Sequence, residues 1–455
     1  MRLRWFEAGS LVAAAVTFAG VLALAPGVLE GARPSLRLGE ILPGIAIAFE
    51  IEPLGLLFAL IASGLWFVSG IYSIGYMRGN EEAHQARFYV CFALAIGGAL
   101  GVAFAGNLLT LYLFYELLTF VTYPLVTHHG DDKARQGGRT YLGLLLLSSM
   151  FFLLPAMIAT WWVAGTLDFT VGGILGGKVS GAAAAGLLAL YAFGIGKAAL
   201  MPLHRWLPAA MVAPTPVSAL LHAVAVVKAG VFSIVKIVVY VFGLDFAADA
   251  FAWLPWVAGF TILAASVVAL RADNLKRRLA YSTVSQLSYV VLATALLAPL
   301  SVVGAVLHIA AHAFGKITLF FAAGAVYTAA HKTEVSELDG LGRRMPWTFA
   351  AFAIGALSMI GLPPAAGFVS KWFMVSGAVA AQHWLALAVI VASTLLNAGY
   401  FLPIVYRAFF LPGKHAGGEA PASMLAAMAV TSALTILMFF FSDLPLALAT
   451  RVAGG

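Results

Sequence analysis

Long apolar runs alternate with short polar segments along almost the whole chain. Thirteen runs are long enough for a helix to cross a bilayer, which needs about 20 apolar residues. We predict helices at 8–29, 53–75, 86–105, 107–127, 141–164, 183–213, 216–241, 251–270, 280–299, 303–328, 347–380, 385–411 and 423–443. Because the runs are continuous and do not alternate, they argue against a transmembrane barrel and predict an all-α polytopic membrane protein.

Two of the predicted segments are too long for one straight helix. Segment 183–213 contains the sequence MPLHRWLP, and segment 347–380 contains GLPP. Proline removes a backbone donor and clashes with the preceding turn, so we expect each helix to break there. Freed backbone groups survive in a membrane only against protein or a water-filled cavity, which makes both breaks candidate transport sites.

The two broken segments are the sixth and the eleventh of the series, an offset of five. Because five is odd, a five-helix repeat must be inverted relative to its partner. We therefore divide the chain into N-terminal spans at 1–85, a first inverted repeat at 86–241, a second inverted repeat at 251–411 and a C-terminal span at 412–455. Paired broken helices at matching positions are typical of transporters.

Composition supports the membrane interpretation. The chain has 455 residues, of which 62% are hydrophobic and 10% are charged, with a mean hydropathy of +0.98. Soluble domains carry about 25% charged residues. One cysteine, Cys91, excludes iron–sulfur clusters, thiolate zinc cages and internal disulfides, and there is no nucleotide-binding glycine motif. We predict no cofactor and no catalytic chemistry on this chain, which must use an ion gradient or take its drive from partners.

Basic residues are distributed unequally between the loops of the two sides. One side receives fifteen: Arg2, Arg4, Arg78, Arg87, Lys133, Arg135, Arg139, Arg271, Lys276, Arg277, Arg278, Lys332, Arg343, Arg344 and Lys414. The other receives four: Arg33, Arg37, Lys178 and Arg451. The positive-inside rule then predicts a cytoplasmic N-terminus, in the inner (plasma) membrane, with the first apolar run retained as a span. The net charge of +7 reflects these loops and not a nucleic-acid partner.

Several ionisable side chains lie deep inside apolar runs. Four are lysines: Lys197, Lys228, Lys316 and Lys371. An ammonium in hydrocarbon costs at least about 2.5–3.5 kcal/mol, so four of them indicate a function, and a proton path fits best. Glu116 is the only carboxylate that we expect at this depth. Lys236 and Arg407 lie near span ends, where we expect their side chains to extend to the surface.

His308, His312 and Lys316 are spaced by four residues. On an α-helix they form one stripe with about 6 Å between neighbours, and imidazole titrates near neutral pH, so the stripe predicts a proton relay. The two histidines also have the spacing of a metal pair, but no carboxylate or cysteine nearby completes a site. For His128 and His129, at a membrane edge, we predict a solvated loop.

We hypothesise that Glu116 pairs with Lys197, since both lie in the first repeat. Burial disfavours an ammonium, whereas a nearby carboxylate stabilises it. Moving Glu116 away from Lys197, or towards another cation, would therefore release a proton to the next group.

Five sequences resemble a known family. They are KAALMPLHRWLPAAMVAPTPVSALLHAVAVVKAG (197–230), NLKRRLAYSTVSQLSYV (274–290), HAFGKITLFFAAGAV (312–326), FYELLTFVTYPLV (114–126) and GLPPAAGFVSKW (361–372). They are similar to the antiporter-like subunits of respiratory complex I and of Mrp-type cation/proton antiporters, over about 86–411. Hydrogenase-linked and carbon-uptake complexes use such subunits too.

The resemblance implies a fold of two inverted five-helix repeats, each with a broken helix. It also implies a role for each buried group. Glu116 would be the essential glutamate partnered with Lys197, and Lys228, or His222 with it, would supply the next relay point. His308, His312 and Lys316 would form the central relay, and Lys371 would be the terminal lysine near the exit. The chain departs from the family in having thirteen predicted spans, where fourteen are common, and in lacking the lateral helix of the largest complex I subunit.

Three functions remain open from the sequence. The chain resembles a proton-translocating subunit that works with other membrane subunits of a larger complex. A self-sufficient Na⁺/H⁺ antiporter is the alternative, but a sodium site needs clustered oxygen ligands, and Glu116 alone is a poor one. A structural coupling subunit with unused lysines is the third.

Overall fold

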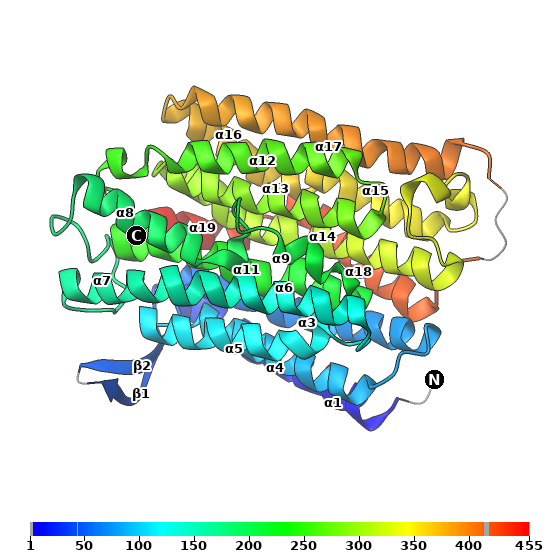
Figure 1. Cartoon of the computed structure of the whole chain (residues 1–455), viewed down its shortest axis with the longest axis horizontal. Coiled ribbons are helices and arrows are strands. Elements are labelled where there is room, and N and C mark those ends of the chain that lie inside the picture. The colour runs from blue at the N-terminus through cyan, green and yellow to red at the C-terminus, as the bar shows by residue number, and fades with distance from the viewer. Residues whose placement is uncertain (1–2, 43, 414–417, 455) are drawn as a thin grey trace.

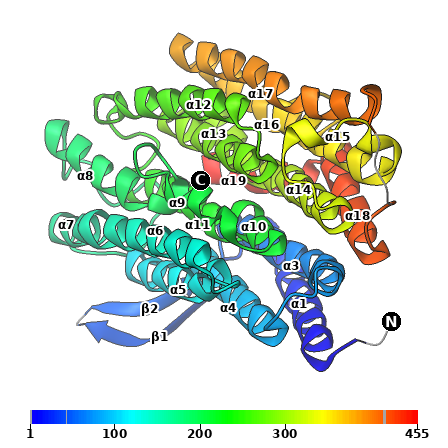
Figure 2. The same cartoon turned by 45° about the vertical axis from the view of Figure 1, so that its right-hand side comes forward.

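The computed structural model describes residues 3–42, 44–413 and 418–454. Its helices lie side by side along the long axis of the molecule (Figure 1). The N-terminus lies at one end of the bundle, and a β-hairpin projects at the other (Figures 1 and 2). We refer to these as the N-terminal end and the hairpin end.

The first part of the chain forms seven helices and the hairpin. The helices are α1 (Trp5–Ala23), α2 (Ala25–Leu29), α3 (Pro53–Gly79), α4 (Gln85–Ala103), α5 (Leu108–Val126), α6 (Asp132–Ser148) and α7 (Leu154–Ala164), with a π-helical turn at Ser149–Leu153 joining the last two. Strands β1 (Ser35–Leu42) and β2 (Ile45–Glu50) pair antiparallel. The hairpin was not predicted, because its segment is too short and too polar for a span.

The remaining helices include those on either side of the two breaks. They are α8 (Gly181–Gly194), α9 (Trp206–Ala209), α10 (Thr215–Ala219), α11 (Val226–Ile237), α12 (Leu254–Arg271), α13 (Leu275–Ala295), α14 (Pro299–Ala330), α15 (Pro346–Ile360), α16 (Ala366–Ala380), α17 (Trp384–Phe410), α18 (Ala422–Phe440) and α19 (Asp443–Gly454). Each of the thirteen predicted ranges overlaps at least one of these helices. Only α19 lies beyond them.

Polar side chains fix where several long helices begin. Glu52, Asn107, Asp131 and Asn274 precede α3, α5, α6 and α13, and each accepts a hydrogen bond from a backbone N–H of the first turn. Such N-caps satisfy donors that have no partner within the helix. They mark the positions where the chain changes direction between apolar segments.

The helices have the length and composition of membrane spans. Among the described residues, ten helical segments are long and apolar enough to cross a bilayer, and α8, α15 and α16 are shorter apolar helices next to the breaks. Every residue of the segment Thr215–Phe242, which contains α10 and α11, is buried, and so are 94% of the residues in an 18-residue apolar window of α14. Polar groups on these two segments are therefore sealed inside the protein, away from lipid.

The loop charges follow the predicted division. Arg2 and Lys414 lie outside the described residues. The other basic residues predicted for the first side lie just before α1, near helix ends and in the loops of the N-terminal end. Arg33, Arg37, Lys178 and Arg451 lie at the hairpin end, where Arg37 pairs with Asp168 at 2.7 Å.

Both predicted breaks are present. Helix α8 ends at Gly194, and a 3-10 turn at Gly196–Ala198 carries Lys197 before the turns that lead to α9. Helix α15 ends at Gly361, whose φ of 90° suits glycine, and α16 restarts at Ala366 after Pro363–Pro364. The breaks therefore place Lys197 and Lys371 beside non-helical backbone.

Candidate functional site

The centre of the site is a direct contact between Lys228 of α11 and His312 of α14. The lysine Nζ lies 2.7 Å from the histidine Nδ1, and the two residues are each 1% exposed. An ammonium and a neutral imidazole at this distance share one hydrogen bond, so a proton can lie on either group. This is the geometry that a proton-transfer pair requires.

His308 extends the contact along α14. Its ring centroid is 6.0 Å from that of His312, which agrees with the stripe predicted from the spacing of four. The ring is held on both sides, because Nδ1 lies 2.9 Å from Ser370 Oγ and Nε2 lies 3.0 Å from Gln286 Oε1. Ser370 and Gln286 were missed from the sequence, where they are ordinary polar residues of apolar helices.

Lys316 lies one helical turn beyond His312 and faces α13. Its ammonium donates to the Leu279 carbonyl oxygen at 3.2 Å and to the Ser282 hydroxyl. His222 packs its ring 4.7 Å from that of Phe320 and lies within electrostatic reach of Lys316. Neither ring nitrogen of His222 has a hydrogen-bond partner among the described residues.

Lys371 is bound by the second break. Its ammonium donates to the carbonyl oxygens of Met359 and Ile360 at 3.0 and 2.9 Å, the last carbonyls of α15, and lies 4.8 Å from the centre of the Tyr289 ring. Carbonyls at a helix C-terminus and an aromatic face both stabilise a cation. The break therefore supplies the polar groups that hold the buried ammonium.

Lys197 has a similar environment at the first break. Its ammonium donates to the Tyr115 carbonyl oxygen at 2.7 Å and to Thr119 Oγ1 at 2.6 Å, and it lies 3.2 Å from the centre of the Tyr115 ring. The hypothesised ion pair with Glu116 does not appear among the salt bridges of the described residues, and the buried Glu116 oxygens have no hydrogen-bond partner there. Among the described residues, Glu116 therefore makes no direct polar contact with Lys197.

The predicted residues thus form a connected group and a separate one. Lys228, His312 and His308 are joined by short contacts, and Ser370 links His308 to the turn that carries Lys371. Lys197 and Glu116 stand apart. The Lys197 backbone packs against Gly230 of α11, the helix that also carries Lys228.

A buried ion pair elsewhere in the bundle was missed. Lys236 of α11 donates to Glu52 Oε1 at 3.0 Å, and Tyr240 donates to Glu52 Oε2 at 3.0 Å, with the two charged side chains 1% and 4% exposed. The prediction that Lys236 extends to the surface was therefore wrong, as was the expectation of a single deep carboxylate. Glu52 lies directly before a span, so its sequence context is that of a loop.

The structure also tests the predictions for His128 and His129 and for Arg407, which were placed near the membrane edge. His129 is partly exposed, but His128 is 3% exposed, so the pair is only half solvated. Arg407 reaches the N-terminal end and pairs with Asp339 at 2.8 Å. Within the described part of the chain, no three His, Cys, Asp or Glu side chains gather as a metal site needs.

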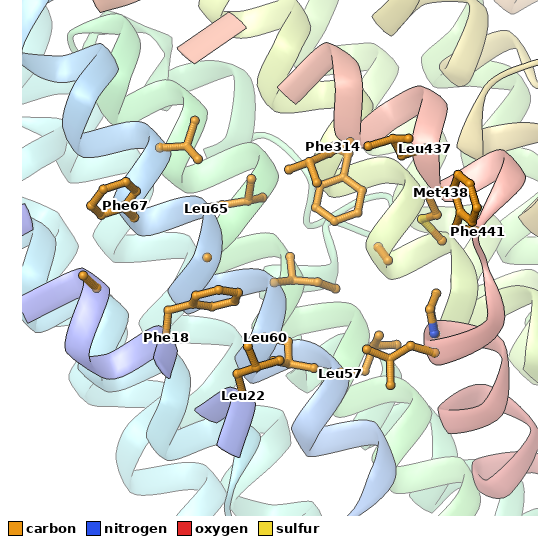
Figure 3. Close-up of a pocket in the computed structure, with 18 residues that line it drawn as sticks. Phe18, Leu22, Leu57, Leu60, Leu65, Phe67, Phe314, Leu437, Met438 and Phe441 are labelled. Carbon is orange, nitrogen blue, oxygen red and sulfur yellow. The ribbon is translucent and has the colours of Figure 1, made fainter. Parts of the chain in front are cut away.

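A large cavity of about 640 Å³ lies between α1, α3, α14, α18 and α19 (Figure 3). Its walls are apolar and include Phe18, Leu57, Phe314 and Leu437. Without donors or acceptors along its walls it cannot carry protons. The relay residues are absent from its lining.

Two family models match the chain. One, described as NADH:quinone oxidoreductase/Mrp antiporter, TM, covers residues 105–397. The other, described as NADH-Ubiquinone oxidoreductase (complex I), chain 5 N-terminus, covers residues 43–89. Together they contain every relay residue predicted above.

Curated relatives agree with the family models. The chain is 33% identical to NADH-quinone oxidoreductase subunit N of Desulforudis audaxviator, over 96% of this chain and 91% of that protein. It is 32% identical to subunit L of the Mycobacterium tuberculosis enzyme, over 84% and 61%. It is also 31% identical to a component of a probable K⁺/H⁺ antiporter of Rhizobium meliloti, over 91% and 41%. The chain therefore spans most of the first relative and about half of the longer ones.

Solved structures show the same fold. A chain of the Mrp complex from Dietzia superposes with a TM-score of 0.89 at 22% identity, covering 99% of this chain and 92% of that one. A chain of the respiratory complex I from Thermus thermophilus gives a TM-score of 0.83 at 23% identity, covering 98% and 95%.

Proposed function

We propose that this chain, which belongs to the family of antiporter-like membrane subunits of NADH:quinone oxidoreductases and Mrp antiporters, moves protons across the membrane as one subunit of a larger complex. The observation that carries the proposal is the buried contact of Lys228 with His312, followed by His308 on the same face of α14. Two or more adjacent groups that exchange a proton, sealed from lipid, are what a proton relay needs.

Each predicted residue has a place in this relay. Lys228, His312 and His308 form the central transfer line, with Lys316 and His222 beside it, and Lys371 is the terminal group at the second break. Glu116 and Lys197 form the first site. Because Glu116 and Lys197 do not touch in this structure, a movement that brings them together would hold a proton on Lys197, and their separation would release it.

We also propose the arrangement of the chain in the membrane. Segments 86–241 and 251–411 form two inverted repeats, each containing one of the breaks, between the N-terminal spans of 1–85 and the C-terminal span of 412–455. The excess of Lys and Arg at the N-terminal end supports a cytoplasmic location for that end, in the inner membrane.

The experiment measures proton uptake into vesicles that contain the complex purified through this chain. A potassium diffusion potential drives the uptake, and an internal pH dye reports it. Glu116→Gln, Lys197→Ala and Lys228→Ala should each abolish uptake while the complex still assembles. Lys178→Ala, an exposed lysine at the hairpin end, should leave uptake unchanged.

Assembled complexes that retain full uptake in all three relay variants would overturn the proposal and favour a structural coupling role. Na⁺-dependent proton exchange by the isolated chain, without partners, would favour the self-sufficient antiporter. Loss of uptake in the three variants but not in Lys178→Ala supports the relay.

A further inference from the structure

A second cavity, of about 230 Å³, opens at the N-terminal end of the bundle. We refer to it as the uptake cavity. Its lining comes from five parts of the chain that are far apart in sequence. They are Tyr76 of α3 with Glu82 in the loop after it, His129 after α5, Met211, Val212, Ala213 and Thr215 before and within α10, Asn274–Lys276 at the start of α13, and Ala323 and Tyr327 of α14 with Lys332 and Thr333 after it. In contrast to the apolar cavity of Figure 3, its walls carry titratable groups.

The mouth of the uptake cavity holds a carboxylate between two imidazoles. Glu82 Oε1 lies 3.3 Å from His129 Nε2, and Glu82 Oε2 lies 3.9 Å from His128 Nε2. The hydrogen bond to Glu82 raises the pKa of His129, whereas burial lowers the pKa of His128. Arg87 donates to the His128 carbonyl oxygen at 2.9 Å and fixes this turn. The Glu82 carboxylate, a proton acceptor, thus shares a hydrogen bond at the surface with the His129 imidazole, whose side chain is 38% exposed.

The inner wall of the cavity points towards the relay. Lys276 donates to the Ala213 carbonyl oxygen at 2.6 Å, and its charge acts on the buried His222 ring, as does that of Lys316. Thr215 donates to the Tyr76 hydroxyl at 3.4 Å on the cavity wall. His222 follows Thr215 by seven residues on the same helical segment, a rise of about 10 Å.

Helix α14 provides a second connection. Ala323 lines the cavity and lies seven residues, or about two turns, from Lys316. Both ring nitrogens of His222 are buried without a partner among the described residues, so this side chain has a free site for a proton. Two helices therefore lead from this one cavity to the same group of buried bases.

We propose that the uptake cavity is the port through which protons reach the relay, with Glu82 and His129 collecting them from solvent and His222 receiving them. This inference rests on the proposed function. It adds the site at which the proton leaves water, in a cavity whose carboxylate attracts cations.

The experiment compares Glu82→Gln and His129→Gln with two neighbouring controls, in the same vesicle assay. Glu81→Gln removes the same charge from the adjacent exposed residue, which does not line the uptake cavity, and His84→Asn removes an exposed imidazole of the same loop. Uptake is measured in weak buffer and again with a high concentration of imidazole, a mobile proton carrier that can replace a surface collector.

In weak buffer the two port variants should slow uptake about tenfold, the lower end of what focusing charges contribute to association rates. Imidazole should restore it, whereas Lys228→Ala should not recover, because its defect lies beyond the port. Uptake equal to that of Glu81→Gln and His84→Asn would overturn the port, as would a defect that imidazole leaves unchanged. If Lys228→Ala itself retains full uptake, the proposed function fails instead.

Discussion

The buried pair of Glu52 and Lys236 should be strongly coupled in stability. We consider Glu52→Gln, Lys236→Met and the double variant. In the native protein the Glu52 carboxylate accepts four hydrogen bonds, from the backbone N–H groups of Leu54 and Gly55, from the Lys236 ammonium and from the Tyr240 hydroxyl. Each single variant leaves one buried charge without its counterion.

Breaking a buried ion pair by removing one partner costs about 3–5 kcal/mol. The double variant removes both charges, and a glutamine can still cap α3, so its cost should be within about 1 kcal/mol of zero. The coupling free energy between the two positions should therefore be about 5 kcal/mol or more. The pair of Arg33 and Glu50 at the same end is the matched control, since it has a separation of 3.4 Å and side chains that are 40% and 29% exposed. Its coupling should not exceed about 1 kcal/mol.

Both cycles are measured on the full chain by titrating mixed micelles with dodecyl sulfate and following reversible unfolding by circular dichroism. The reasoning is refuted if the two single costs at Glu52 and Lys236 simply add in the double variant. It is equally refuted if Lys236→Met costs no more than Arg33→Met, because burial would then have contributed nothing.

Three further outcomes follow from the described contacts. Gly230→Ala should lower the free energy of unfolding by about 1–3 kcal/mol and slow proton uptake, because a Cβ at this position meets the Lys197 backbone. Gly97→Ala, where a Cβ meets nothing within 4 Å, should be harmless. Equal unfolding free energies of the two variants would contradict the close packing. Ser370→Ala should lower the free energy of unfolding by about 1–3 kcal/mol, because it leaves His308 Nδ1 unpaired. The Ser301 hydroxyl is buried without a partner among the described residues, so Ser301→Ala should change this free energy little. The same unfolding titration checks both variants. The hydrogen bond to Glu82 raises the pKa of His129, so this bond contributes fully below the unfolded pKa of about 6.5 and is lost as pH rises through the higher folded value. The melting temperature of His129→Gln should therefore approach that of the parent as the pH is raised above neutral. A difference in melting temperature that stays constant as the pH rises would argue against the bond.

Much of the helical framework could be predicted because a bilayer imposes strong rules on sequence. Apolar runs located the helices, proline located the breaks at 201–208 and 361–364, and a spacing of four placed His308 and His312 on one face of α14. These features are local. Each feature depends on residues within a few helical turns of one another, so it can be predicted from a single sequence.

Contacts between distant segments could not be predicted. Lys236 meets Glu52 across 184 positions, and nothing near either residue indicates the other. The groups that bind the Lys197 ammonium could not be predicted either, since one acceptor is the Tyr115 backbone carbonyl oxygen. Every residue has such a carbonyl, so it leaves no signal in the sequence. A charge at a predicted span end therefore has two outcomes, exposure as for Arg407 or burial as for Lys236, and the neighbouring helix decides between them.

The chain starts at one end of the bundle and finishes near the other, where α19 lines a hollow with Arg33 and Pro53 (Figure 1). This has a practical consequence for fusion reporters. A fluorescent protein matures in the cytoplasm and alkaline phosphatase folds only outside it, so each should be active on a different terminus of this chain. One pair of fusions, and the pair with the reporters exchanged, would thus fix the sidedness of every loop at once.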